Sequence, residues 1–397
     1  MSDGFNYGGE IAEVEQHFKV WPKFGNKIAV VDADLLPYQI GYSIAAHYAL
    51  MYTQAVFSVE QGYFKELRET PQYEEAFQMM CKELNSWVVS AGCDSAVLFC
   101  TNSASNYRLD LAFTEDYKGQ RTTEKPPFFE ELKFDLVNRL GAYMSDGNEA
   151  DDEISIFIHT QAREQGCEAG DEFHREVCNT VCCSSDKDST ITGGWHYDPR
   201  KGVLRFHDRL GALEPKTKVK EVNDYLKFPL FNGEPVHPDL CKKDGELYYL
   251  DGKVCDHFAR GKNAGQPKTK RMTVGKRQSV SIEDLKGYGL KFFYAQLIMG
   301  DNADNYSGLS GRGATYAYEL LDKCKSEEEL YMAVLGAYRE TYGTGKHLVK
   351  NFRGGSAMLT AYQRMLEQGR LAWMQTERGE IWRSKHYCPT GVEDVWN

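Results

Sequence analysis

The feature that most constrains this chain is an acidic stretch at residues 147–154, Gly-Asn-Glu-Ala-Asp-Asp-Glu-Ile, placed directly before an apolar segment. Asn148 is a favourable N-cap, and the helix dipole stabilises acids in a first turn, which accounts for one or two of the carboxylates. Four carboxylates in five positions repel one another, most strongly when the following helix packs on a core. A hard divalent cation such as Mg²⁺ or Mn²⁺ would relieve this repulsion, because carboxylate oxygens are its preferred ligands.

The composition indicates a large globular chain. With 397 residues, 42% of them apolar, it can bury a substantial core, as one domain with insertions or as two to three domains. No apolar run is long enough to cross a bilayer, and the polar N-terminus has no secretory signal. The 11 cysteines lack the spacing of a disulfide framework. We therefore expect a cytoplasmic protein that is neither secreted nor in a membrane.

Short apolar runs predict an α/β fold. Residues 27–31 and 95–100 are β-branched and apolar without alternation, which is typical of strands buried on both faces of a parallel sheet. Residues 35–92 lie between them, contain few helix breakers, and predict two or three helices. A third apolar run covers residues 177–182, and a fourth covers residues 292–299.

Acidic residues follow three of these runs. Asp32 comes after the first run, Ser-Ser-Asp-Lys-Asp (184–188) after the third, and Gly-Asp-Asn-Ala-Asp-Asn (300–305) after the fourth. Because α/β sheets bind ligands at the carboxyl ends of their strands, we expect these acids to converge with residues 149–152 at one sheet edge. Seven or eight carboxylates would suffice for two ions and predict metal-dependent phosphoryl transfer. For Asp32 alone, capping of the next helix is an equally good explanation.

Two further segments are suited to phosphate. Tyr117-Lys118-Gly119-Gln120-Arg121 offers a ring for base stacking and two cations, although an ordinary solvated loop explains so short a motif as well. Residues 307–314, which lead into an expected helix at 315–321, form a glycine-rich turn whose N–H groups could face a phosphate. The glycines concerned are Gly308, Gly311 and Gly313.

Taken together, these motifs resemble the flap-endonuclease and 5′-to-3′ exonuclease family, most closely its bacteriophage members. The resemblance covers roughly residues 27–192 and 283–321. It rests on the order of Val-Val-Asp-Ala-Asp (30–34), Tyr-Arg (107–108), Tyr-Lys-Gly-Gln-Arg (117–121), Glu-Ala-Asp-Asp (149–152), Ser-Asp-Lys-Asp (185–188) and the stretch 300–313. It implies a PIN-like fold, in which helices flank a twisted, mostly parallel sheet, with a helical arch over about 117–148 and a helix–three-turn–helix over about 300–321.

The resemblance also implies roles for individual residues. Lys118 and Arg121 would grip the scissile phosphate, Tyr117 would stack on a terminal base, and Arg108 joins the substrate-binding set. The duplex backbone would contact the glycine-rich turn, with K⁺ between them. Asp32, Asp151 and Asp186 are the acids assigned to catalysis. Two Mg²⁺ or Mn²⁺ ions would be held by Asp32, Glu149, Asp151, Asp152, Asp186, Asp188, Asp301 and Asp304.

The implied activity is hydrolysis of DNA phosphodiesters at a 5′ end or flap, in replication, recombination or primer removal, inside the host cell if the chain is phage-encoded. RNA–DNA hybrids and replication proteins are further expected partners. One position departs from the family, which usually has an Asp shortly before the Tyr-Arg pair, where this chain reads Cys-Thr-Asn-Ser (100–103). A DNA-end-binding protein that does not cut is therefore one alternative hypothesis. A PIN-type ribonuclease, which shares the acids, is another.

The remaining sequence suggests an extension at 1–26, an insertion at 193–282 with short hairpins, and a return to the core at 283–397. The insertion holds a basic segment that predicts either a contact with the DNA backbone, through Lys270 and Arg271, or a solvated loop. Its cations are Lys262, Lys268, Lys270, Arg271, Lys276 and Arg277.

Overall fold

A computed structural model describes residues 27–102, 105–120, 124–236, 242–243, 246–247 and 255–383. The chain divides into two compact units, residues 1–214 with 285–397, and residues 215–284. The expected N-terminal extension lies outside the described residues.

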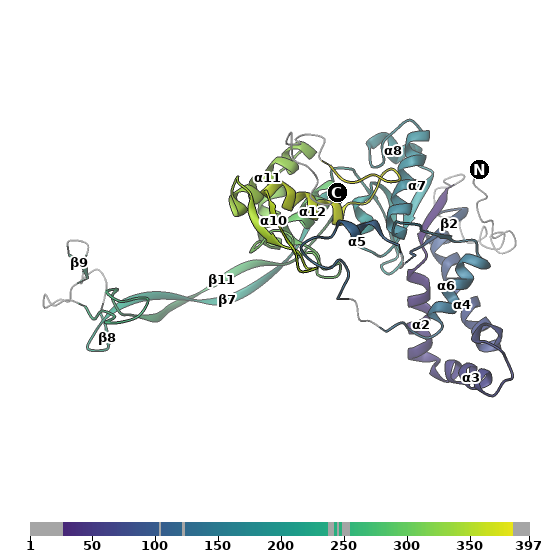
Figure 1. Ribbon diagram of the computed structural model, residues 1–397, viewed down its shortest axis with the longest axis horizontal. Coiled ribbons are helices and arrows are strands. Elements are labelled where there is room, and N and C mark those ends of the chain that lie inside the picture. The colour runs from purple at the N-terminus through teal and green to yellow at the C-terminus, as the bar shows by residue number, and fades with distance from the viewer. Residues whose placement is uncertain are drawn as a thin grey trace. The chain divides into compact units, whose positions relative to one another are not determined.

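The first unit is built on a six-stranded sheet of order β3-β2-β1-β4-β5-β6 (Figure 1). All neighbours are parallel except the last pair, which is antiparallel. The expected α/β class with a mostly parallel sheet is thereby confirmed. The strands are β1 (Ile28–Asp32), β2 (Ser95–Cys100), β3 (Tyr143–Met144), β4 (Thr180–Cys183), β5 (Gly194–Asp198) and β6 (Val203–His207).

Both faces of the central strands are buried. Ala29 and Val31 face one apolar cluster, which contains residues of α2 (Leu35–His47), α4 (Pro71–Ser90) and α6 (Phe129–Asn138). Val30 faces a second cluster, which contains residues of α7 (Ala150–Glu164). Successive side chains of a strand point to opposite faces, so a strand covered on both sides must be apolar throughout. This requirement explains the unbroken apolar run from Ile28 to Val31.

The helices flank the sheet and form a C-terminal bundle. None of the described helices is both long and apolar enough to cross a membrane. Their bounds are α2 (Leu35–His47), α3 (Ala49–Glu60), α4 (Pro71–Ser90), α5 (Tyr107–Leu111), α6 (Phe129–Asn138), α7 (Ala150–Glu164), α8 (Glu172–Val177), α9 (Gly289–Met299), α10 (Ala314–Leu321), α11 (Glu327–Tyr342) and α12 (Ala361–Ala372), with short 3-10 helices η1 (Leu67–Glu69) and η2 (Asp188–Ile191) and a hairpin of β12 (His347–Lys350) and β13 (Ser356–Leu359).

The fourth apolar run is a helix and not part of the sheet. Residues 292–299 lie in α9, whose side chains from Phe292 to Ile298 are all buried. A helix that is apolar all round is typical of the centre of a bundle, and α9 packs against α10, α11 and α12. The expected helix at 315–321 is α10, so the segment 300–313 joins two helices.

The expected helical arch is not matched by the described part of residues 117–148. The helix found there is α6, and its Phe129, Leu132 and Leu136 are buried. Residues 112–120 and 124–128 contain no helix. Pro126 and Pro127 explain part of this difference, because proline lacks a donor and restricts the residue before it.

The second unit is a long β-ribbon. Its main strands are β7 (Ala212–Phe231) and β11 (Thr269–Tyr288), which are neighbours in a three-stranded sheet with β8 (Glu234–Pro235). The expected turn at residues 231–235 is the β7–β8 hairpin, with Asn232 and Gly233 both at positive φ, as a two-residue turn requires. Two further short strands are β9 (Lys242–Lys243) and β10 (Glu246–Leu247).

The insertion is shorter than the sequence predicted. Residues 194–207 supply β5 and β6 of the main sheet, so the separate unit spans 215–284 and not 193–282. The sequences of β5 and β6, Gly-Trp-His-Tyr-Asp and Val-Leu-Arg-Phe-His, contain no unbroken apolar run of the kind that identified β1, β2 and β4.

Phe128 offers a test of the core. Its ring is 2% exposed and packs edge-on against Tyr52 and Tyr73, at centroid distances of 5.1 and 5.6 Å. We expect Phe128→Ala to lower the free energy of unfolding by about 3–5 kcal/mol, because it leaves a cavity. Phe173, which is 56% exposed, is the matched control, and Phe173→Ala should change the urea unfolding midpoint little. Equal effects of the two substitutions would contradict this packing.

Candidate metal centre

The first acidic group lies at the carboxyl edge of the central strands. Asp32 ends β1, and β4, the parallel neighbour of β1, leads into Ser184 and Asp186. The Ser184 hydroxyl donates to Oδ2 of Asp32 at 3.3 Å and accepts the N–H of Asp186 at 3.1 Å. Adjacent parallel strands therefore bring together two carboxylates that are far apart in the sequence.

The start of α7 adds more carboxylates to this group. Glu149 is the N-cap, and a capping box joins Glu149 and Asp152 through their side chains and backbone N–H groups. The helix packs against β1, β2 and β4, so its first turn lies at the same sheet edge. The acidic first turn also benefits from the helix dipole.

Burial and mutual repulsion disfavour the ionised form of two of these acids. Burial, followed by the carboxylates of Asp34 and Asp186, raises the pKa of Asp32 to about 8. Burial, followed by Asp32 and Asp186, raises the pKa of Asp151 well above its usual range. These acids would ionise fully at neutral pH once a cation joined them.

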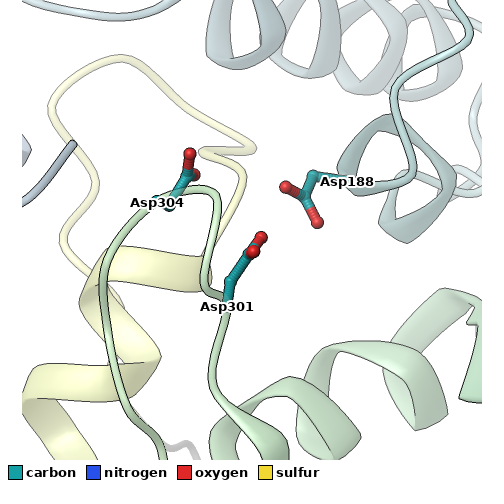
Figure 2. Close-up of side chains that lie close together, drawn as sticks. All are labelled: Asp188, Asp301 and Asp304. Carbon is teal, nitrogen blue, oxygen red and sulfur yellow. The ribbon is translucent and has the colours of Figure 1, made fainter. Parts of the chain in front are cut away.

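A second acidic group combines η2 with the loop after α9. Figure 2 shows the carboxylates of Asp188, Asp301 and Asp304 pointing toward one another, and one oxygen from each lies within 4.8 Å of the others. The loop is closed by hydrogen bonds in both directions between the backbones of Asp301 and Tyr306. Burial, followed by Asp186, raises the pKa of Asp188 to about 7. Three converging oxygen donors of this kind could hold a divalent cation.

Two lysines lie against these carboxylates. The Lys118 ammonium donates to Oε1 of Glu149 and lies 3.8 Å from Oδ1 of Asp304. The Lys187 ammonium donates to Oδ2 of Asp301 at 2.5 Å. Although burial acts in the opposite direction, Lys118 and Arg108 together lower the pKa of Glu149. Each acidic group thus has a partly exposed positive charge at its edge.

Arg108 is not at a surface that could bind substrate, contrary to what the sequence motifs led us to expect. Its side chain is 0% exposed and binds Asp152 through two bonds, Nη1 to Oδ2 at 2.5 Å and Nη2 to Oδ1 at 2.8 Å. It also donates to the carbonyls of Leu371 and Trp373. The prediction that Arg108 contacts DNA does not fit a guanidinium with all these partners and no access to solvent. Both oxygens of Asp152 are engaged as well, so its predicted use as a metal ligand would require breaking this pair.

Tyr117 is also buried, with 2% of its surface exposed. Its hydroxyl lies 3.0 Å from Oε2 of Glu149 and 3.0 Å from Oδ2 of Asp304, and thereby bridges the two acidic groups. In this arrangement the ring presents no free face to a base, contrary to the stacking role expected from the sequence. The next residue, Lys118, has φ +57° and donates its N–H to the carbonyl of Asp304 at 2.9 Å.

The glycines of the turn divide into two kinds. Gly308 is buried, its N–H donates to Oε1 of Gln368 at 2.7 Å, and a Cβ there would lie 2.3 Å from the nitrogen of Gly300. Its role is therefore close packing, and its N–H is not available to a phosphate. Gly311 and Gly313 are exposed, with open space around both, directly before α10. These two remain suited to a phosphate at a helix N-terminus.

Three other predicted residues either belong to the second unit or fall outside the described residues. Lys270 and Arg271 belong to the second unit. Arg121 lies outside the described residues, so its predicted contact with the scissile phosphate stays a prediction.

Sequence reasoning missed Gln296 and Lys187. The amide of Gln296 on α9 donates to Oδ1 of Asp188 and so links the C-terminal bundle to the sheet edge. An amide within the apolar run 292–299 is the sequence signal for such a buried polar contact. Lys187 lies between Asp186 and Asp188 in the sequence, where a counter-charge was to be expected.

A cavity of about 840 Å³ adjoins the acidic groups. Ser185, Asn302 and Ala303 line it and are neighbours in sequence of the metal-ligand candidates. Tyr38 and Tyr42, whose rings are stacked at 6.3 Å, and the exposed Arg200 also line it. This combination of rings and a cation is suited to unpaired nucleotides.

Comparison with known proteins yields structural neighbours only. No protein-family model and no curated protein matches the chain. The chain is similar to a crystal structure of the D15 protein of bacteriophage T5 with metal ions, at 14% identity and a TM-score of 0.36, over 80% of this chain and 91% of that one. It is also similar to a complex of the T5 D15 flap endonuclease with DNA and metal ions, at 14% identity and a TM-score of 0.36, over 87% and 99%.

The buried Arg108–Asp152 pair yields a prediction about stability. Arg108→Leu should lower the free energy of unfolding by about 3–5 kcal/mol, because it leaves a buried carboxylate without its partner. A second change, Asp152→Leu in the same chain, should recover part of this loss, since it removes the unpaired charge. Urea unfolding of both variants measures the effect. A single variant as stable as the wild type would contradict the structural role.

The raised pKa of Asp32 predicts how stability depends on pH without metal. A carboxyl with a folded pKa near 8 and an unfolded pKa near 4 binds more protons when folded, so stability falls as pH rises between those values. In chelator, the Tm of the wild type should fall from pH 5 to 8, and Asp32→Asn should reduce that fall by roughly 1–2 °C for each kcal/mol of repulsion that it removes. Asp146→Asn, at an exposed position nearby, is the control. Parallel curves for wild type and Asp32→Asn would contradict the assignment.

Proposed function

We propose that this protein is a divalent-metal-dependent nuclease of the flap-endonuclease kind, which hydrolyses DNA phosphodiesters at a 5′ end or flap. The observation that carries the proposal is the convergence of acids from four distant segments. Asp32 follows β1, Asp186 and Asp188 follow β4, Glu149 and Asp151 begin α7, and the loop after α9 adds a further pair, Asp301 and Asp304.

The donor set suits hard cations. All the candidate ligands are carboxylate oxygens, which favour Mg²⁺ or Mn²⁺ over softer metals. Asp32, Glu149, Asp151 and Asp186 would hold one ion, and Asp188, Asp301 and Asp304 a second. Bound there, such ions would activate a water molecule and neutralise charge on the phosphate in the transition state.

The chain's own side chains have complementary tasks. Lys118 and Lys187 would exchange their carboxylate partners for phosphate oxygens as substrate arrives, because both ammonium groups lie at the edges of the acidic groups. Lys187 is half exposed, and Lys118 retains some exposure, so both could reach a ligand. Arg108 would hold Asp152 and Glu149 in place without contact to the substrate. The cavity beside Ser185 would receive the unpaired strand, with Tyr38 and Tyr42 available to its bases.

The finer parts of the proposal remain predictions. They include the 5′ polarity, the use of two ions, K⁺ near the glycine-rich turn, cleavage of RNA in a hybrid, and a place in replication, recombination or primer removal together with replication proteins. They rest on the resemblance of the sequence motifs to the flap-endonuclease family.

One feature favours the alternative of a protein that binds DNA ends without cutting them. Lys118 and Lys187 already neutralise Glu149 and Asp301, and the segment that begins Cys100-Thr101-Asn102 supplies no acid where the family usually has one. A PIN-type ribonuclease shares the acids as well. Labelling either a DNA strand or an RNA strand of the substrate distinguishes a ribonuclease from a deoxyribonuclease. Comparing cleavage and binding by Asp186→Asn and the wild type distinguishes a nuclease from a protein that only binds.

Asp186→Asn tests the proposal. Digestion of a 5′-flap duplex with Mg²⁺ should fall by at least about 100-fold, because a loss of several kcal/mol of transition-state stabilisation changes the rate by that factor. Binding to the same duplex in chelator should persist or tighten, since one negative charge is removed. Asp171→Asn, at an exposed position, is the matched control.

Three outcomes would contradict the nuclease proposal. One is equal product from the wild type with Mg²⁺ and with chelator. Another is binding of the wild type to DNA with no cleavage under any divalent ion, which supports the non-cutting alternative. The third is cleavage restricted to an RNA strand, which supports the ribonuclease.

A further inference from the structure

The β-ribbon of residues 215–284 has a composition opposite to that of the rest of the chain. It contains 14 Lys and Arg against 10 Asp and Glu, a net charge of +4, whereas the remaining residues carry −15 of the total −11. Such segregation is not needed for folding. It indicates a surface for an anionic partner, because net charge governs association more than fold.

Three acids of the ribbon form ion pairs with cations of the neighbouring strand. Glu283 pairs with Lys218 at 2.9 Å, Glu221 with Lys276 at 3.2 Å, and Asp224 with Arg277 at 2.7 Å. These pairs link β7 to β11, which are neighbours in the sheet. The pairs hold the two strands together, and several other cations of the ribbon take no part in them.

The cations left over are exposed. Among the residues that the structure describes, Lys220, Lys227 and Lys270 make no ion pair with a carboxylate, and all three are exposed. Arg271 is exposed too, and its guanidinium lies 5.9 Å from the centre of the Tyr225 ring. A planar ring beside a cation is a common arrangement for contact with a sugar–phosphate backbone.

Several apolar side chains of the ribbon are exposed to solvent. Val219, Tyr225 and Val280 are 57%, 52% and 64% exposed. A two-stranded ribbon with both faces in water is only marginally stable, so a partner that covers one face would stabilise it. A strand of 20 residues measures about 65 Å, close to two turns of duplex at about 34 Å each. The major groove of DNA admits a two-stranded ribbon.

We propose that the β-ribbon is a duplex-binding arm that contacts DNA phosphates without regard to sequence, through Lys220, Lys227, Lys270 and Arg271. This inference deepens the proposed nuclease function by assigning the source of duplex affinity. Long flexible lysines aimed at phosphates carry no base information, so the arm would add affinity and salt dependence but no sequence preference.

The test compares two variants with the same change in charge. The arm variant is Lys220→Gln, Lys227→Gln, Lys270→Gln and Arg271→Gln combined. The control variant combines Lys65→Gln, Lys82→Gln, Lys346→Gln and Lys350→Gln, four exposed lysines of the first unit that belong to no proposed site. Circular dichroism and Tm first establish that both fold.

Binding to a blunt 30-base-pair duplex capped by hairpin loops is then measured in chelator at several salt concentrations. For the arm variant, the plot of log K against log salt concentration should become less steep. The magnitude of its negative slope should decrease by about 3–4, since each phosphate contact contributes about 0.9. The control should keep the wild-type slope. A duplex of scrambled sequence should give the same result.

Cleavage separates this proposal from the previous one. If the wild type cuts a 5′ flap, the arm variant should show a raised KM and an unchanged kcat. If the wild type cuts nothing, the nuclease proposal fails, and the binding measurement still decides on the arm. Equal slopes for arm variant, control and wild type would overturn the arm, and would leave a protein partner as the ligand of this surface.

Discussion

The structure depends on how a dense group of carboxylates is tolerated at one edge of the sheet. Acids that share a poorly screened region raise one another's pKa, as Asp32 and Asp188 show, and each added charge costs stability. The chain compensates with three cations of different exposure. Arg108 is fully buried, Lys118 is partly exposed, and Lys187 is about half exposed. That gradient separates a fixed counter-charge from two that can change partners.

The fixed counter-charge also joins distant parts of the chain. Arg108 binds Asp152 at the start of α7, and it binds the carbonyls of Leu371 and Trp373 at the end of α12. The N–H of Gln375 donates to the same Asp152 carboxylate. A buried ion pair is favourable only when its remaining donors and acceptors are satisfied, and these backbone groups satisfy them. The geometry of the metal-ligand candidates on α7 is thus tied to the C-terminal bundle, which also supplies Asp301 and Asp304.

The sequence was sufficient for the parts of the fold that follow from local pattern. β1, β2 and β4 could be predicted because strands covered on both faces must be apolar, and the acids that end them then had to share an edge. Exposure could not be predicted. Arg108 and Tyr117 have residue types suited to DNA, yet their partners are 44 and 187 residues away, at Asp152 and Asp304. The β-ribbon was missed as well, because Pro215, Pro229 and Asn223-Asp224 resemble the boundaries of several short strands.

The same acids that suit the centre to metal make DNA a poor ligand for the first unit. A unit with a net charge of −15 repels a polyanion, and ions bound among the carboxylates remove only part of that charge. Affinity must then come from cations that are not consumed by neighbouring acids. Because salt screens charges beyond about 8 Å at physiological ionic strength, a lysine on a 65 Å ribbon acts on the nearest phosphates and hardly on the whole duplex. In the proposed arrangement, lysines concentrated on a separate element would let one chain keep a strongly acidic centre and still bind a DNA substrate.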